Sequence, residues 1–125
     1  MTLLDTHVAL WLYTGETKRL SARALQEVER GGLVVSPLVE LEIAFLNEIG
    51  RVADTPGMIL SALSASIGLR VAQIGFAPLC SAAVGITWTH DPFDRMLAAH
   101  AVVAGLPLLT KDQTILENLD LAFWD

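Results

Sequence analysis

The feature that most constrains the fold of this chain is the regular alternation of short apolar runs with longer segments of helical character. The apolar runs predict five β-strands, at residues 2–5, 33–35, 70–74, 107–110 and 121–124. Helices are expected at residues 7–13, 21–30, 37–49, 56–66, 78–84, 92–104 and 113–118. Strands that are separated by helices pair in parallel and carry helices on both faces of the sheet. The sequence therefore predicts an α/β fold with a central parallel sheet of about five strands.

Length and composition indicate a single compact unit. A chain of 125 residues suits one domain with one core, and we expect this domain to span residues 1–125. The content of 53% hydrophobic and 18% charged residues excludes a disordered chain and favours subunit contacts. No apolar stretch reaches the roughly 18 residues of a membrane span, and no signal peptide is recognisable. The lone Cys80 excludes an intramolecular disulfide, so we expect a cytoplasmic protein without membrane contact.

Two acidic side chains lie on the apolar faces of predicted helices. Ser36 and Pro37 predict the start of helix 37–49, in which a rotation of roughly 100° per residue places Glu42 within the apolar arc. Asp94 shares the apolar stripe of helix 92–104 with Leu97, Ala98, Ala101 and Val102. A carboxylate in such a place is costly unless a cation or a hydrogen-bond donor compensates it. Glu42 and Asp94 are therefore candidate metal ligands, whereas Asp91 is expected to cap helix 92–104, with a place near the metal site as the alternative.

Two further aspartates end predicted strands. Asp5 closes the run TLLD and Asp112 closes LPLLTKD, and ligands of open parallel sheets bind at the carboxyl ends of the strands. With Glu42 and Asp94, these residues can hold one or two Mg²⁺ or Mn²⁺ ions. The net charge of −6 opposes the binding of nucleic acid unless such ions reverse the local sign. Divalent ions activate water and stabilise charge on phosphoryl oxygens, so the pattern favours hydrolysis of phosphodiester bonds.

The sequence segments that carry these acids also match a known family. LLDTHVALW, SPLVELEIAFLNEIGR, DPFDRMLAAHAV and LPLLTKD, in this order and followed by LAFWD, resemble the PIN-domain ribonucleases, specifically the VapC-like toxins of bacterial toxin/antitoxin pairs. The resemblance covers essentially the whole chain. It implies a PIN fold, Mg²⁺-dependent endoribonuclease activity that leaves 5′-phosphate and 3′-hydroxyl ends, and inhibition by a cognate antitoxin protein. The acidic quartet of the family falls on Asp5, Glu42, Asp94 and Asp112.

Several residues near these acids have two interpretations each. Thr6 and Thr110 either donate hydrogen bonds to the carboxylates or serve the local turn and strand. Arg95 and Lys111 either contact RNA phosphates or form surface ion pairs. The aromatic residues that either stack on bases or belong to the core or an interface are Trp11, Tyr13 and Trp88. The three histidines, His7, His90 and His100, lack the spacing of a zinc site.

The sequence also allows a dimeric assembly and functions other than that of a nuclease. The apolar residues around Trp11 and in helix 56–66 motivate the hypothesis of a homodimer with a groove for an antitoxin segment. A non-catalytic PIN-like interaction module is the main alternative function. A receiver-type phospho-accepting domain needs paired acids after the first strand, and a haloacid-dehalogenase-type phosphatase needs Asp-x-Asp, whereas this chain has Asp5 followed two residues later by His7.

Overall fold

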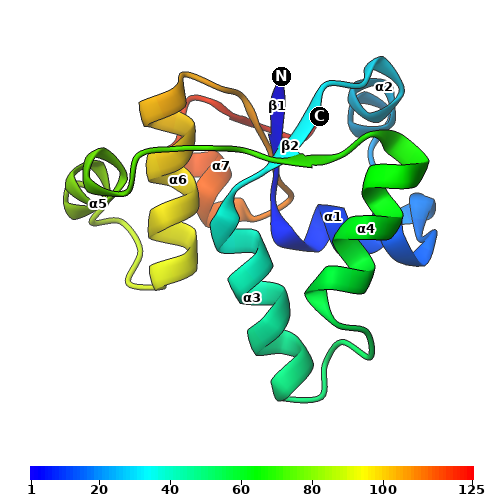
Figure 1. Cartoon of the computed structure of the whole chain (residues 1–125). Coiled ribbons are helices and arrows are strands. Elements are labelled where there is room, and N and C mark those ends of the chain that lie inside the picture. The colour runs from blue at the N-terminus through cyan, green and yellow to red at the C-terminus, as the bar shows by residue number, and fades with distance from the viewer.

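The computed structural model of the chain describes all 125 residues and has a five-stranded sheet at its centre (Figure 1). The strands lie in the order β3-β2-β1-β4-β5, and every neighbouring pair is parallel. Their bounds are β1 (Thr2–Leu4), β2 (Leu33–Val35), β3 (Arg70–Val71), β4 (Leu108–Leu109) and β5 (Ala122–Phe123). The helices are α1 (Thr6–Thr14), α2 (Ala22–Arg30), α3 (Pro37–Glu48), α4 (Pro56–Ile67), α5 (Phe76–Val84), α6 (Pro92–Ala104) and α7 (Gln113–Asn118). The predicted α/β fold with a parallel sheet is confirmed.

Helices cover both faces of the sheet because successive strand residues point to opposite sides. On one face, Leu4, Leu33 and Leu109 belong to a buried cluster that α1, α2, α3 and α4 complete. On the other face, Leu3, Val34 and Leu108 pack against α6 and α7. The register agrees with this division, since Leu3 pairs with both Val34 and Leu108. The resulting three layers hold the carboxyl ends of all strands at one edge, which is the lower edge in Figure 1.

Local capping explains why two of the helices begin where they do. The Ser36 hydroxyl accepts a hydrogen bond from Leu38 N at 3.3 Å, directly before Pro37 opens α3. A carboxylate oxygen of Asp91 accepts hydrogen bonds from the backbone N–H groups of Phe93 and Asp94 at 2.8 and 3.1 Å, which confirms Asp91 as the cap of α6. The amino-terminal turns of both helices lie at the end of the molecule where β1 and β4 end, since Glu42 and Asp94 line the same pocket as Asp5 and Asp112.

The structure corrects several details of the sequence-based expectation. The strand predicted at 70–74 is reduced to Arg70–Val71, because it forms an edge of the sheet and pairs on one side only. A short 3₁₀ helix, η1 (Thr17–Arg19), was not predicted. Val102 is 50% exposed and does not share the buried stripe of Leu97 and Ala98 in α6. No helix combines the length and apolar character needed to cross a lipid bilayer.

The apolar arc predicted for α3 is only half covered. Val39 and Ile43 are buried in the core, as expected. Leu41, Phe45 and Ile49, which follow one another at helical spacing, remain 58%, 46% and 50% exposed. We call these three residues the α3 stripe. Its exposure leaves apolar area that the sheet does not bury.

Candidate active site

The predicted acidic quartet lines one pocket at the carboxyl ends of the strands. The pocket measures about 500 Å³ and is lined by Asp5, His7, Val8, Trp11, Glu42, Asp91, Asp94, Lys111 and Asp112. Asp5 ends β1, Glu42 comes from the second turn of α3, Asp94 from the first turn of α6, and Asp112 follows β4. Four segments that are far apart in the sequence therefore meet at the edge where parallel sheets bind ligands.

A buried threonine connects the two aspartates that end strands. The hydroxyl of Thr110, which is fully buried, donates a hydrogen bond to Asp5 Oδ2 at 2.6 Å and accepts one from Asp112 N at 3.0 Å. The Asp112 side chain is held in turn, since its Oδ1 accepts from Ile115 N at 2.9 Å and so caps α7. One oxygen of each carboxylate is thus engaged by the protein. Of the two interpretations of Thr110, the hydrogen bond to a carboxylate is the one the structure has.

A second buried threonine orients the glutamate in the same way. Thr6 Oγ1 donates to Glu42 Oε1 at 2.5 Å across the contact between α1 and α3. Burial raises the pKa of Glu42, while this hydrogen bond from Thr6 works in the opposite direction and the nearby Asp5 adds to the rise. Burial also raises the pKa of Asp5, and the hydrogen bond from Thr110 opposes that rise. Both carboxyl groups are harder to ionise than in water, although each has a donor.

Asp94 has the least favourable environment for a negative charge. Burial raises its pKa from 3.8 to about 7, and the charges of Asp91, Asp5, Asp112 and Glu42 act in the same direction. No hydrogen bond within the chain lowers the pKa of this carboxyl group, in contrast to Asp5 and Glu42. The pocket therefore concentrates carboxylates whose mutual repulsion the protein compensates only in part.

The donor set fits a hard divalent cation. Carboxylate oxygens are the ligands that Mg²⁺ and Mn²⁺ prefer, and burial followed by mutual repulsion raises the pKa values of Asp5, Glu42 and Asp94, so a bound cation would stabilise their charged forms. The acids line the walls of an open pocket, and no three acidic, histidine or cysteine side chains approach closely enough to form a closed metal cage. Mg²⁺ keeps several waters and is bound by few carboxylates, so walls of this kind suit it better than a closed cage.

The two predicted cationic residues have different positions. Lys111 lines the pocket, and its Nζ lies 6.0 Å from the centroid of the Trp11 ring. Arg95 is turned away from the pocket, because its Nη2 donates to the backbone oxygens of Ala83 and Val84 in α5 at 3.1 and 3.4 Å. The expectation that Arg95 meets RNA phosphates beside the acids is therefore not supported by its position.

Sequence reasoning underrated two residues of this pocket, His7 and Trp11. The sequence assigned His7 no place in the site and left Trp11 open between base stacking and a core or interface role, yet both line the pocket, and His7 is exposed. They lie four residues apart on α1, a spacing that places side chains on the same side of a helix. His7 lies two residues after Asp5, at the start of α1, and Trp11 is one helical turn further on. This position beside a strand-ending acid is the signal that would have identified both residues.

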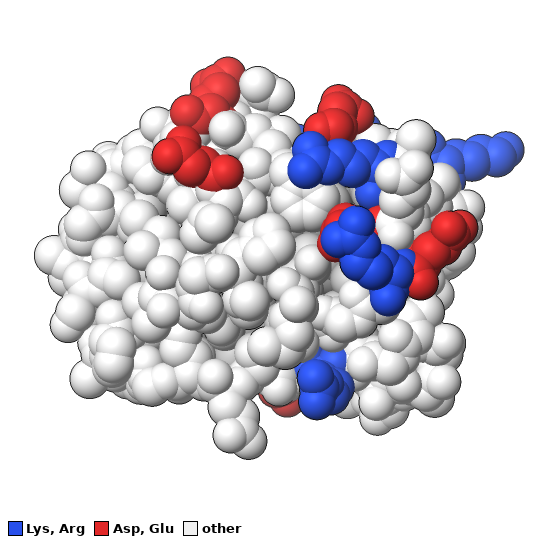
Figure 2. All heavy atoms as spheres, turned by 90° about the horizontal axis from the view of Figure 1, so that it is seen from above, with Lys and Arg blue, Asp and Glu red and all other residues white.

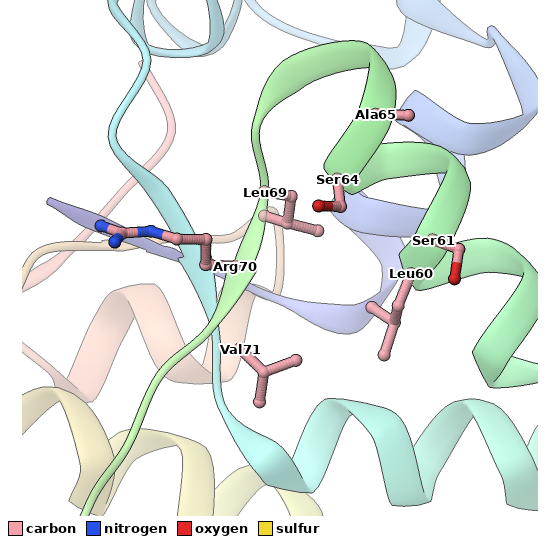
Figure 3. Close-up of a pocket in the computed structure, with 7 residues that line it drawn as sticks. All are labelled: Leu60, Ser61, Ser64, Ala65, Leu69, Arg70 and Val71. Carbon is pink, nitrogen blue, oxygen red and sulfur yellow. The ribbon is translucent and has the colours of Figure 1, made fainter.

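Another cavity of similar size contains no acidic group. It measures about 530 Å³ and lies between α4 and β3, lined by Leu60, Ser61, Ser64, Ala65, Leu69, Arg70 and Val71 (Figure 3). The Arg70 guanidinium extends away from α4, and its Nη2 lies 4.0 Å from the sulfur of Met1. Figure 2 shows the opposite end of the molecule from the acidic pocket, where Lys and Arg side chains gather toward the right with acidic side chains among them, and a further acidic group lies apart at the upper left. The cavity in Figure 3 offers no converging carboxylates.

Comparison with known proteins gives consistent matches. The family model described as "PIN domain" matches residues 2–120. Ribonuclease VapC22 of Mycobacterium tuberculosis is 34% identical over 117 residues, which cover 90% of this chain and 88% of the relative. A toxin-antitoxin complex from Klebsiella pneumoniae superimposes with a TM-score of 0.69 at 16% identity, over 98% of this chain and 96% of that chain. VapBC2 from Rickettsia felis, bound to a DNA fragment from its promoter, gives 0.70 at 12% identity, over 99% and 98% of the respective chains. The two solved structures show likeness of fold.

Proposed function

Since this chain belongs to the PIN-domain family, we propose that it is a VapC-type toxin that cleaves RNA as a metal-dependent endoribonuclease. The observation that carries the proposal is the meeting of Asp5, Glu42, Asp94 and Asp112 in one pocket at the carboxyl ends of the strands. The name of the 34% identical relative, a ribonuclease, supports RNA as the substrate. We assign the four acids as the metal-binding and catalytic residues.

In this proposal Asp5 and Asp94 hold the principal Mg²⁺ ion, Glu42 contributes to it directly or through water, and Asp112 completes the site or supports a second ion. When bound, Mg²⁺ or Mn²⁺ supplies positive charge that activates water and stabilises the phosphoryl oxygens. Residues of the chain orient the ligands, accept a proton and position the substrate. Thr110 and Thr6 fix the orientation of Asp5 and Glu42 through their hydroxyl groups. A neighbouring carboxylate accepts the proton of the attacking water, and the pocket walls hold the phosphodiester in line for displacement.

RNA cleavage in vitro tests the proposal. Labelled single-stranded RNA is incubated with the purified protein in Mg²⁺, in Mn²⁺ and in excess EDTA, and the ends of the products are identified. We expect cleavage with either metal, no cleavage in EDTA, and a loss of at least about a hundredfold in Asp5→Asn and Asp94→Asn. Asp120→Asn, which removes an exposed acid outside the pocket, is the matched control. Equal cleavage by all variants, or none by the wild type, would favour the non-catalytic interaction module.

The proposal includes a cognate antitoxin as the protein partner and action in the cytoplasm. The Klebsiella pneumoniae structure is a toxin-antitoxin complex, which supports a similar partner for this chain. Co-expression with the neighbouring small reading frame, followed by purification through a tag on that protein, tests the pairing. A stable complex with reduced RNA cleavage is expected, and full activity of the toxin in a stable complex would contradict inhibition.

We also propose a homodimer, but through a different surface from the one that the sequence suggested. Leu10, Trp11, Leu12 and Tyr13 are half-buried against the core. In α4, Ile59 and Leu63 are buried, and Met58 is the large apolar residue left exposed. The α3 stripe offers more exposed apolar area, and its Phe45 lies 6.1 Å from the ring of Phe93. Self-association through this stripe would bury apolar area that the fold leaves in water.

A further inference from the structure

A second, smaller pocket adjoins the acidic pocket and shares a wall with it. This neighbouring pocket measures about 290 Å³ and is lined by Leu10, Tyr13, Thr14, Glu16, Arg51, Val52, Ala53 and Asp54, together with His7 and Trp11. His7 and Trp11 also line the acidic pocket. The two aromatic side chains therefore separate two depressions that open side by side on α1. A chain lying in the acidic pocket can continue across this wall into the second pocket.

The shared wall has the composition of a base-stacking surface. The rings of His7 and Trp11 lie 6.3 Å apart with an angle of 51° between their planes. The Arg19 guanidinium lies 5.6 Å and Lys111 Nζ 6.0 Å from the Trp11 ring. The edge contact with Trp124, at 6.1 Å, holds the indole from the core side. Aromatic faces flanked by cations bind the bases and the phosphates of single-stranded nucleic acid.

The second pocket contains one cation that no carboxylate of the chain pairs with. Glu16 is neutralised by Arg19, whose Nε lies 3.1 Å from Glu16 Oε1, and it accepts a hydrogen bond from Thr14 at 2.7 Å. Asp54 accepts a hydrogen bond from the Tyr13 hydroxyl. Arg51 has no carboxylate partner, because the only ion pairs of the chain are Arg19–Glu16 and Arg30–Glu27. The charges of Glu16, Asp54, Arg19 and Arg51 sum to zero, so this pocket lacks the net negative charge of the acidic pocket, and Arg51 is its unpaired cation.

The outer wall of the pocket is held in place before any ligand arrives. Asn47 Nδ2 donates to the backbone oxygens of Val52, Ala53 and Asp54 at 2.9, 3.3 and 3.1 Å. This amide fixes the loop that follows α3 to α3 itself, and the hydrogen bond from Tyr13 to Asp54 ties the same loop to α1. A preformed wall lowers the entropic cost of binding a flexible strand.

We propose that the second pocket is a nucleotide subsite, in which the base next to the cleaved bond stacks on Trp11 and the adjoining phosphate meets Arg51. The inference rests on the proposed function in that the bound strand is the RNA whose phosphodiester lies in the acidic pocket. Trp11 is here a residue that positions the substrate, and it takes no part in the chemical step. Stacking tolerates every base, so the subsite requires a base without selecting a single one. Single-stranded RNA is the class that fits, since its bases are free to unstack.

The decisive experiment removes the base instead of the protein side chain. The cleavage position on a labelled single-stranded RNA is first mapped with the wild type, and abasic nucleotides are then introduced singly at two positions on each side of it. At one of these positions the missing base should lower kcat/KM by roughly tenfold or more. Trp11→Leu should lower kcat/KM on intact RNA by a similar factor, mainly through KM, and should lose nothing further on that abasic RNA. Trp11→Phe should restore most of the loss, whereas Trp88→Phe, in a residue outside both pockets, should match the wild type.

A binding assay separates failure of the subsite from failure of the nuclease. Fluorescence anisotropy of the same RNAs is measured in Ca²⁺ with Asp94→Asn, with and without Trp11→Leu. If the wild type cleaves RNA but Trp11→Leu has the same effect on intact and on abasic RNA, the subsite is wrong and the nuclease proposal stands. Binding that depends jointly on the base and on Trp11, without cleavage by the wild type, would overturn the nuclease and leave the subsite standing. Loss of both binding and cleavage would overturn both. If Trp11→Leu weakens only the antitoxin complex, the pocket binds protein and the proposal is wrong.

Arg51 gives an independent check through salt dependence. Replacing one phosphate-binding cation should weaken RNA binding on all sequences and reduce the slope of log K against log salt concentration by about 1. We expect this change for Arg51→Gln. Arg70→Gln is the matched control, because Arg70 is also exposed and without a carboxylate partner but lies in neither pocket. Equal slopes for the wild type and Arg51→Gln would contradict the role of Arg51.

Discussion

Replacing Asp94 by Asn should stabilise the metal-free protein most above neutral pH, and progressively less as the pH falls from about 7 toward 3.8. Burial and the neighbouring acids raise the pKa of Asp94 from 3.8 to about 7. Between these two pH values the folded protein holds a proton that the unfolded chain has lost, so stability falls as the pH rises through this interval. Above pH 7 the whole penalty is present. An asparagine of the same shape carries no charge and avoids it.

The size of the effect follows from the same values. A difference of about 3 pKa units corresponds to at most about 4 kcal/mol. Asp94 is only half-buried, and solvent in the open pocket screens the repulsion, while the amino-terminal end of α6 favours a carboxylate by about 0.3–1 kcal/mol. We therefore expect about 1–2 kcal/mol. For a domain of this size, that corresponds to an increase in Tm of roughly 5 °C.

Thermal unfolding in EDTA at pH 8 and at pH 5 measures this directly. Asp94→Asn should melt higher than the wild type at pH 8, and the difference should be smaller at pH 5, because at pH 5 only the lower part of the interval between 3.8 and about 7 has been crossed. Asp120→Asn, which removes an acid outside the pocket, should have no effect at either pH. Addition of Mg²⁺ at pH 8 should raise the Tm of the wild type more than that of Asp94→Asn. A variant that melts lower than the wild type at pH 8, or that differs equally at both pH values, would refute the electrostatic reasoning.

Three further predictions concern other parts of the molecule. Thr110→Val leaves Asp112 N–H without its acceptor and Asp5 without its donor, so we expect stability to fall by about 1–3 kcal/mol and Mg²⁺ affinity by roughly 10- to 100-fold. Thr110→Ser keeps both hydrogen bonds and should keep both properties, and calorimetric titration with Mg²⁺ measures the affinities. His100 is 1% exposed and its Nδ1 has no hydrogen-bond partner, so His100→Leu should raise the unfolding free energy in urea by about 1 kcal/mol, and a decrease would contradict this. Phe45→Lys, in the α3 stripe, should shift the mass in light scattering from dimer to monomer, whereas Val103→Lys in α6 should not.

The fold was predictable because each of its elements carries a local signal. Apolar runs bounded by glycine, proline or an acidic residue gave the strands, and Ser36-Pro37 and Asp91-Pro92 gave the starts of α3 and α6. The site was predictable for a related reason. A carboxylate within an apolar run or on the apolar face of a helix conflicts with burial, and Asp5 and Glu42 stand in such places. The structure brings these residues to one pocket because parallel strands end at the same edge.

The features that sequence reasoning missed depend on contacts between segments. The periodicity of α3 identified its apolar residues but gave no information on how many of them the sheet would cover, so the exposed α3 stripe was not anticipated. The position of Arg95 depends on where the carbonyl groups of α5 lie, and no local pattern reports this. Likewise, the role of Trp11 stayed open between base stacking and the core, because a half-buried aromatic side chain in a helix has the same local pattern as a buried one.

The hydrogen bonds of the pocket divide the quartet into two kinds of residue. Asp5, Glu42 and Asp112 each have one oxygen bonded to Thr110, Thr6 and the α7 backbone respectively, which leaves the other oxygen for a ligand. Their orientation is therefore set by the fold before an ion binds. No donor within the chain lowers the pKa of Asp94, and every neighbour raises it. In the proposed metal site, a divalent ion would gain three oriented ligands at little cost in conformational entropy and would relieve the repulsion on the fourth. A bound ion should therefore favour the ionised form of Asp94 more than that of the other acids, and the pKa of Asp94 should show the largest change when Mg²⁺ binds.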